Sequence, residues 1–203
     1  MHRLTWARIE AALAARPPAR VTDPVAARAA VALILREDRG GLEILLIRRA
    51  DHPLDPWSGQ MAFPGGRAEP GDVSLAATAV RETLEETGID LAREAEFLGP
   101  LDEVQAMARL RPVDLAIAPF VYRLHGPGQA TLSDEVRSVH WLPLDLLLRP
   151  ECRSTLDYAH LDAVLRFPCL RVQELEIWGL TYRMFVGLAE RLGLPLQAEA
   201  PGA

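Results

Sequence analysis

The sequence predicts an α/β protein, and three features lead to this prediction. Two continuous apolar runs, residues 27–35 and 42–47, flank a turn at 38–41, which is the pattern of a β-hairpin buried on both faces. A short apolar piece that ends in a glycine pair precedes a run of helix-forming residues, so the middle of the chain reads as strand, loop and helix. Apolar residues at helical spacing in 171–191 predict a closing helix.

The length of 203 residues suits one domain with a sizeable core. Leu4, Ile9 and Leu13 predict an amphipathic helix near the start, and the proline-containing stretch 16–20 reads as a linker. We therefore divide the chain into an N-terminal helix and linker (1–25), a main domain (26–192) and a C-terminal tail (193–203).

The middle segment combines a strand, a glycine-rich loop and a helix. The apolar piece 61–63 ends at Pro64 and the pair Gly65 and Gly66, and glycine lets the backbone approach a ligand closely. Either Asp72 or Ser74 can cap the helix that follows. Its end is predicted at Gly88, where a glycine suits the position after the last helical turn.

Three glutamates of this helix form an acidic face. Glu82, Glu85 and Glu86 are spaced i, i+3 and i+4, so their side chains lie together and repel one another. They also lie toward the helix C-terminus, where the macrodipole disfavours negative charge. Arg81 can orient Glu85, but one guanidinium does not neutralise three carboxylates. Divalent cations bound through the carboxylate oxygens would neutralise them. The alternative is a solvated acidic surface, and the preceding glycine loop favours the metal site.

The proline-rich stretch 48–59 reads as a long loop, and such loops are often functional. Arg48 and Arg49 at its start suit an anionic ligand, although paired arginines at a strand end are also common on plain surfaces. Trp57 either stacks on a base or packs beneath the loop, and the sequence leaves both readings open.

Further strands are expected after the central helix. A loop at 107–112 carries Arg109 and Arg111 and connects two of them. The regions expected to be strands are 97–101, 115–122 and an alternating segment that ends at Pro143.

Composition and charge exclude several classes of protein. The net charge of −6 and the pI near 5.4 argue against nonspecific nucleic-acid binding, which needs a basic surface. Cys152 and Cys169 have no metal-ligand spacing and indicate a reducing compartment. The N-terminus has neither a signal-peptide core nor a membrane span, so we expect a cytoplasmic protein with no membrane partner.

The central motif resembles that of a known family. Gly66, Asp72 and the run Arg81-Glu82-Thr83-Leu84-Glu85-Glu86-Thr87-Gly88-Ile89 resemble the Nudix box, which is a glycine, an acid, then Arg-Glu-x-x-Glu-Glu-x-Gly and an aliphatic residue. The box usually has Glu where this chain has Asp72, and one residue fewer before its arginine. Both departures are similar to the family branch that hydrolyses coenzyme A.

The resemblance implies an α/β/α sandwich with a central mixed sheet and a metal-dependent hydrolase that acts on nucleoside diphosphate linkages. It assigns Mg²⁺ or Mn²⁺ to Glu82, Glu85, Glu86 and the Gly65 carbonyl, with Arg81 holding Glu85 in place. The general base is Glu82 or Glu135, because many members carry a further glutamate just before a late strand. A surface acid at position 135 is the alternative.

The resemblance to the coenzyme A branch extends over most of the chain. The segments that resemble it are 45–49, 59–66, Thr78-Ala79, 134–136 and 177–181. They imply cleavage of coenzyme A to 4′-phosphopantetheine and adenosine 3′,5′-bisphosphate. Ile47 replaces the usual Thr, and the loop before Gly59 lacks the usual basic residue.

The 3′-phosphate of coenzyme A must therefore find its cation elsewhere, and Arg48, Arg49 and Arg67 are the candidates. Without such a cation, ADP-ribose, a dinucleotide or a nucleoside triphosphate is the better substrate. A Nudix-like binding module without activity is a third alternative, which the three retained carboxylates disfavour. The partner is thus a small nucleotide, and the sequence leaves a homodimer open.

Overall fold

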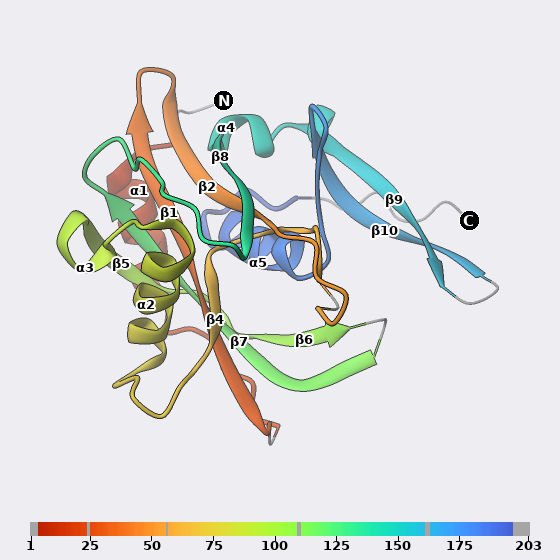
Figure 1. The fold of residues 1–203 in the computed structure, drawn as a ribbon. Coiled ribbons are helices and arrows are strands. Elements are labelled where there is room, and N and C mark those ends of the chain that lie inside the picture. The colour runs from red at the N-terminus through yellow and green to blue at the C-terminus, as the bar shows by residue number, and fades with distance from the viewer. Residues whose placement is uncertain (1–3, 24, 56, 109–110, 161–162, 197–203) are drawn as a thin grey trace.

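The computed structural model describes the chain except for a few short segments. The described ranges are 4–23, 25–55, 57–108, 111–160 and 163–196. A central β-sheet lies between helix α2 (Leu75–Thr87) on one face and helices α1 (Trp6–Ala14) and α5 (Gly179–Arg191) on the other (Figure 1). This arrangement confirms the predicted α/β sandwich.

The central sheet is mixed. Its path runs β3-β2-β1-β7-β5, while β4 pairs with β1, β6 with β7 and β8 with β2. The β1 and β7 strands are parallel, and the other pairs are antiparallel. The strands are β1 (Ala27–Asp38), β2 (Gly41–Arg49), β3 (Met61–Ala62), β4 (Gly65–Arg67), β5 (Ala95–Pro100), β6 (Val104–Ala108), β7 (Arg111–Leu124) and β8 (Val136–Pro143).

The predicted hairpin is confirmed, and both of its faces are buried. Strands β1 and β2 pair antiparallel, with Asp38 opposite Gly41 across a two-residue turn. Side chains alternate along a strand, so Leu33 and Leu35 join the core beneath α1 and α5, whereas Ala32 joins the core beneath α2. Apolar residues on both faces explain why the two strands read as continuous apolar runs.

Helix α2 begins and ends where the sequence places its caps. The Ser74 hydroxyl accepts a hydrogen bond from the Ala77 amide, so Ser74 is the cap and Asp72 is free for another role. At the other end Gly88 has a φ of 70°, and its N–H donates to the Leu84 carbonyl.

A second sheet replaces part of the predicted closing helix. Its strands are β9 (Arg153–His160), β10 (Ala163–Val172) and β11 (Leu175–Trp178), so the expectation of one helix over 171–191 is wrong for its first eight residues. Gly179 has a φ of 63°, which the interior of a right-handed helix does not allow. A helix cannot continue through this residue toward 171, so α5 begins at Gly179. Ile177 is buried as a strand residue opposite Leu170.

The connection at 107–112 also differs from the prediction, because strand β6 reaches Ala108 and strand β7 begins at Arg111. Arg109 lies outside the described residues. The remaining short elements are α3 (Leu91–Glu94), α4 (Leu144–Leu147) and a 3₁₀ turn at Pro150–Cys152.

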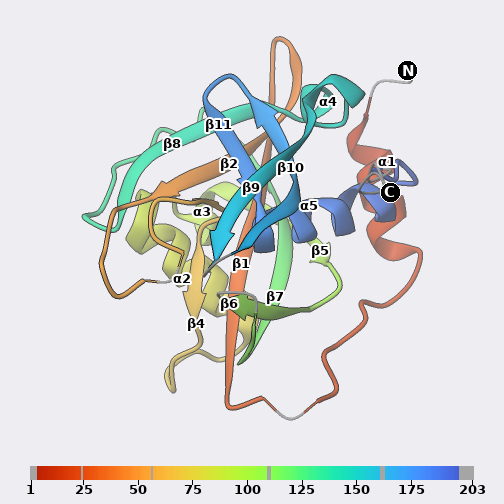
Figure 2. The same cartoon turned by 90° about the vertical axis from the view of Figure 1, so that its right-hand side faces the viewer.

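The N-terminal helix belongs to the main core. Ile9 and Leu13 are buried with residues of the central sheet, and the Arg8 guanidinium donates to the Leu192 carbonyl beyond α5. Figure 2 shows α1 beside the end of α5. The linker is held to the body as well, since Arg16 forms a two-pronged ion pair with Asp102. The proposed domain bounds stay a prediction.

Cys152 and Cys169 are both buried free thiols. In the described part of the chain, no helix is both long and apolar enough to cross a membrane.

Candidate active site

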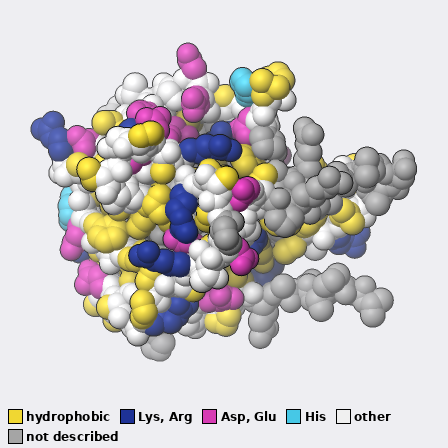
Figure 3. Space-filling view, turned by 90° about the horizontal axis from the view of Figure 1, so that it is seen from below, with side chains coloured by type: hydrophobic (Ala, Val, Ile, Leu, Met, Phe, Trp, Pro, Cys, Tyr) yellow, Lys and Arg dark blue, Asp and Glu magenta, His cyan; other side chains and the backbone are white. Residues whose placement is uncertain are grey.

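A cavity of about 790 Å³ lies between helix α2 and helix α5. Its volume falls in the range of pockets that enclose small ligands. The face seen from below carries several arginine side chains among acidic and apolar ones, in spite of the net negative charge (Figure 3). The predicted site residues that line the cavity are Arg49, Gly65, Arg67, Arg81, Glu82, Glu85, Glu86 and Glu135.

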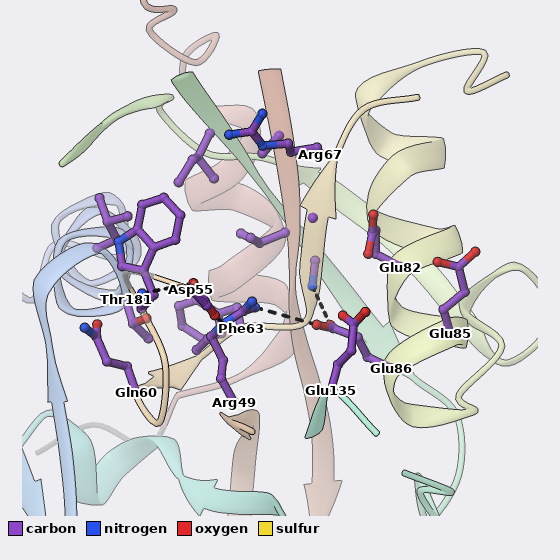
Figure 4. A pocket seen from close by; sticks show the side chains of 18 of the residues that line it. Arg49, Asp55, Gln60, Phe63, Arg67, Glu82, Glu85, Glu86, Glu135 and Thr181 are labelled. Carbon is purple, nitrogen blue, oxygen red and sulfur yellow. Dashed lines mark hydrogen bonds and ion pairs between the residues drawn. The ribbon is translucent and has the colours of Figure 1, made fainter. Parts of the chain in front are cut away.

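The acidic face of α2 forms one wall of this cavity, as Figure 4 shows. Arg81 holds two of its glutamates, with Nη1 at 3.0 Å from both Glu82 Oε1 and Glu85 Oε2. The Glu82 side chain is 15% exposed and that of Glu85 is 58% exposed. Burial raises the pKa of Glu82, although Arg81 opposes the rise.

Glu86 is the most buried of the three, with 4% of its side chain exposed. The Gly65 N–H donates to Glu86 Oε2 at 2.8 Å, and Arg49 Nη1 lies 3.9 Å from Oε1. Burial nevertheless raises the pKa of Glu86 to about 7, and the negative charges of Glu82 and Glu135 add to this effect. The helix therefore holds a buried carboxylate that Arg49 offsets only in part.

Asp72 has a role that was not predicted from the sequence. Its carboxylate accepts two hydrogen bonds from Arg81, Nε to Oδ1 at 3.0 Å and Nη2 to Oδ2 at 3.1 Å. The Thr78 hydroxyl donates to the same carboxylate at 2.8 Å. These bonds hold the pKa of Asp72 well below its usual range. Asp72 thus fixes the guanidinium that positions Glu82 and Glu85. The sequence signal for this role was that Asp72 occupies the acid position of the box pattern.

The two glycines of β4 are needed for close contact with the sheet and the helix. A Cβ on Gly65 would lie 2.2 Å from the Ala30 carbonyl oxygen, and the Gly65 φ is 151°. A Cβ on Gly66 would lie 2.4 Å from the carboxyl carbon of Glu82. Glycine at these positions therefore lets the loop pass directly over the acidic face.

Glu135 lines the cavity together with the acidic face of α2. Figure 4 shows its side chain beside Glu86. The charge of Glu135 contributes to the raised pKa of both Glu82 and Glu86, which places it within electrostatic reach of them. Its carbonyl accepts from the Ala50 amide at 2.8 Å, so the turn before β8 is tied to the loop after β2.

The three arginines proposed for the 3′-phosphate differ in position. Arg48 is not among the cavity-lining residues, and its Nε donates to the Gly59 carbonyl at 3.3 Å. Arg49 lines the cavity but pairs with Asp55 at 2.7 Å. Arg67 lines the cavity, and its guanidinium has no hydrogen bond or ion pair within the described ranges.

The donor chemistry of the acidic face fits a hard divalent cation. The carboxylates of Glu82, Glu85, Glu86 and Glu135 line the same cavity, repel one another and bring oxygen ligands of the kind that Mg²⁺ and Mn²⁺ prefer. In the present arrangement Glu82 and Glu85 turn to Arg81, and Glu86 turns to Gly65. Consequently, no three His, Cys, Asp or Glu side chains of the described residues are placed to hold a single ion.

The opposite wall comes from the loop after β2 and from α5. Thr181 donates its hydroxyl hydrogen to the Met61 carbonyl at 2.8 Å, which fixes α5 against β3. The place of Gln60 at this wall was not predicted from the sequence, and Trp57 both packs against the core and lines the cavity. Residues that line this part of the cavity are Trp57, Gln60, Leu180, Thr181 and Met184.

Known proteins resemble the chain in both sequence and fold. The NUDIX domain model matches residues 26–161. The NudL protein of Yersinia pestis, named as an uncharacterized Nudix hydrolase, is 32% identical over 157 residues, which are 74% of this chain and 73% of that protein. An uncharacterized protein of Schizosaccharomyces pombe is 43% identical over 116 residues, which are 56% of this chain and only 35% of that longer protein.

A solved structure supports the same fold. The crystal structure of a MutT/nudix family protein from Enterococcus faecalis matches with a TM-score of 0.55 and 20% identity. The match covers 94% of this chain and 70% of that one. At this identity the likeness concerns the architecture, including the sheet and the helices on its two faces.

Proposed function

Because the chain belongs to the Nudix hydrolase family, we propose that it is a metal-dependent hydrolase whose substrate is coenzyme A or a derivative of it. Water would cleave the diphosphate linkage to give 4′-phosphopantetheine and adenosine 3′,5′-bisphosphate. A bond forms between the water oxygen and one phosphorus, and the bond from that phosphorus to the bridging oxygen breaks. The water loses a proton to a carboxylate, and the leaving phosphate takes the electron pair of the broken bond.

The observation that carries this proposal is the meeting of four separate sequence segments at one cavity. Each segment resembles the coenzyme A branch, and each contributes a residue to the lining of the cavity that the acidic face of α2 borders. These residues are Arg49 from 45–49, Gly65 from 59–66, Glu135 from 134–136 and Thr181 from 177–181. A substrate recognised by all four segments would lie with its diphosphate within reach of the glutamates.

The roles of the acidic residues follow from their positions. Glu82, Glu85 and Glu86 would hold Mg²⁺ or Mn²⁺, with the Gly65 carbonyl as a further ligand. Such an ion lowers the pKa of a bound water and neutralises charge on phosphoryl oxygens. Arg81, itself fixed by Asp72, orients Glu82 and Glu85.

The proton acceptor is Glu82 or Glu135, which both line the cavity. The pH dependence of kcat in the single variants Glu82→Gln and Glu135→Gln distinguishes the two. Loss of the acidic limb of the pH–kcat profile is expected in the variant that lacks the base.

Side-by-side turnover measurements test the substrate. With Mg²⁺ present, we expect the highest kcat/KM for coenzyme A among coenzyme A, ADP-ribose, a dinucleotide and deoxynucleoside triphosphates. A higher value for another of these compounds would replace coenzyme A by that substrate class. No turnover of any of them would favour a binding module without activity.

Arg67→Gln tests the recognition of the 3′-phosphate. Arg67 lines the cavity without a described partner, so we expect its loss to lower kcat/KM for coenzyme A by about 10-fold or more, the usual size of a charged hydrogen bond. Turnover of dephospho-coenzyme A, which lacks this phosphate, should change little. Arg48→Gln is the matched control, and an equal loss in that variant would contradict the assignment.

A further inference from the structure

The wall opposite the glutamates combines a flat aromatic ring with a free amide. Figure 4 shows Gln60 and Thr181 on one side of the cavity and Glu82 and Glu85 on the other. The loop that carries Gln60 also carries Trp57, and both residues line the cavity. Two ends of different chemistry suit a ligand with a charged diphosphate and a less polar terminal group.

Trp57 is held in one orientation by its polar groups. Its indole Nε1 donates to the Met107 carbonyl at 3.2 Å, and its backbone N–H donates to Asp55 Oδ1 at 3.0 Å. The ring is half-buried against the core. Because its only polar atom is already bonded, the indole can offer a ligand its flat face but no hydrogen bond.

Gln60 has a fixed backbone and an available side chain. Its N–H donates to the Trp57 carbonyl at 3.2 Å, and its carbonyl accepts from the Arg49 amide at 3.0 Å. Gln60 is half-buried, and its side-chain amide makes no hydrogen bond to any residue that the structure describes. The amide is therefore available to donate to a ligand and to accept from it.

We propose that Trp57 and Gln60 form the subsite for the adenine base, with the base stacked on the indole and its edge read by the amide. An amide presents one donor and one acceptor side by side, which matches the adenine N6 amino group and N7. On this edge guanine and hypoxanthine present two acceptors, O6 and N7, so the amide oxygen would lose its donor. Stacking on an aromatic ring supplies affinity for any base.

This inference rests on the proposed function, because it assigns one part of the same substrate. Adenosine 3′,5′-bisphosphate, a predicted product with no bond left to hydrolyse, allows binding to be measured with Mg²⁺ present. Calorimetric titrations with this compound and with inosine 3′,5′-bisphosphate should show tighter binding of the adenosine form. The wild type should prefer the adenosine form by about 5-fold or more, and Gln60→Ala should remove most of that preference. Trp57→Ala should weaken binding of both by about 10-fold or more, whereas Trp57→Phe retains most affinity.

Controls separate a local effect from a folding defect. Trp6→Phe removes a tryptophan that bonds to Glu37 outside the cavity and should bind like the wild type. If Trp57→Ala lowers the melting temperature strongly, the comparison of Trp57→Phe and Gln60→Ala with the wild type decides the question.

Three outcomes would overturn the adenine subsite. In the first, the wild type does not bind adenosine 3′,5′-bisphosphate. In the second, Gln60→Ala keeps the affinity and the base preference of the wild type. In the third, the Trp57 variants bind 4′-phosphopantetheine more weakly but bind adenosine 3′,5′-bisphosphate as the wild type does. The last result would assign the wall to the pantetheine arm. If the adenosine compound binds as expected but coenzyme A is not turned over, the proposed substrate is wrong and the adenine subsite stands.

Discussion

Glu86→Gln is expected to abolish most hydrolysis, with kcat lower by about 10³-fold, because one metal ligand supplies several kcal/mol at the transition state. The change is nearly isosteric, and the amide oxygen can still accept from the Gly65 N–H. Steady-state assays with saturating Mg²⁺ measure the loss. Glu94→Gln, on the exposed surface of α3, is the control and should behave like the wild type.

Without metal, Glu86→Gln should stabilise the folded protein at neutral and higher pH. The folded pKa of Glu86 is about 7 and its ordinary value is 4.5, so the metal-free protein should lose stability as the pH rises from about 4.5 through 7. This difference corresponds to about 3 kcal/mol. In EDTA at pH 8, Glu86→Gln should therefore unfold at a higher denaturant concentration than the wild type.

Added Mn²⁺ should stabilise the wild type far more than Glu86→Gln, because an ion that binds only the folded state stabilises it in proportion to its affinity. Urea unfolding with EDTA and with Mn²⁺ measures both effects. Full activity in Glu86→Gln, or equal stabilisation of both proteins by Mn²⁺, is the outcome that would refute its role as a ligand.

Gly65→Ala is expected to destabilise the fold by about 3 kcal/mol or more. The new Cβ would lie 2.2 Å from the Ala30 carbonyl oxygen and 2.6 Å from the Val31 Cα. These are backbone atoms of the central strand β1 and have little freedom to move, and the Gly65 φ of 151° adds strain for any residue with a side chain. Denaturant unfolding at a fixed pH measures the change in the free energy of unfolding.

Gly71→Ala is the matched control for this substitution. It lies in the turn before α2, and a Cβ at this position has no atom within 4 Å. We expect the control to change the free energy of unfolding by less than about 0.5 kcal/mol, as is usual for surface substitutions. A Gly65→Ala protein as stable as this control would show that β4 can move away from β1.

Elements with strong local signals could be predicted from the sequence. The hairpin of β1 and β2 follows from apolar runs that are buried on both faces, and helix α2 follows from Ser74 and Gly88 at its ends. Spacing on one helix places Glu82, Glu85 and Glu86 together without any tertiary information. The acidic wall of the cavity was therefore predictable.

Features that depend on distant contacts were not predictable. Residues 171–178 have apolar spacing that a helix would also accept, and only the pairing of β11 with β10 and the positive φ of Gly179 decide against it. Asp72 could cap a helix, and its bonds to Arg81 require the turn that precedes α2. Likewise, the position of Gln60 depends on the contacts of the loop between β2 and β3, in which Gln60 bonds to the backbone of Arg49 and Trp57.

Crystals grown with Mn²⁺ and adenosine 3′,5′-bisphosphate, measured at a wavelength where manganese scatters anomalously, test the metal assignment most directly. We expect anomalous peaks bounded by the carboxylates of Glu82, Glu85 and Glu86, with phosphate oxygens of the bound product against them. Nucleotide in the cavity with no peak at these carboxylates, or peaks only at other surface acids, would contradict a metal-dependent reaction at this helix.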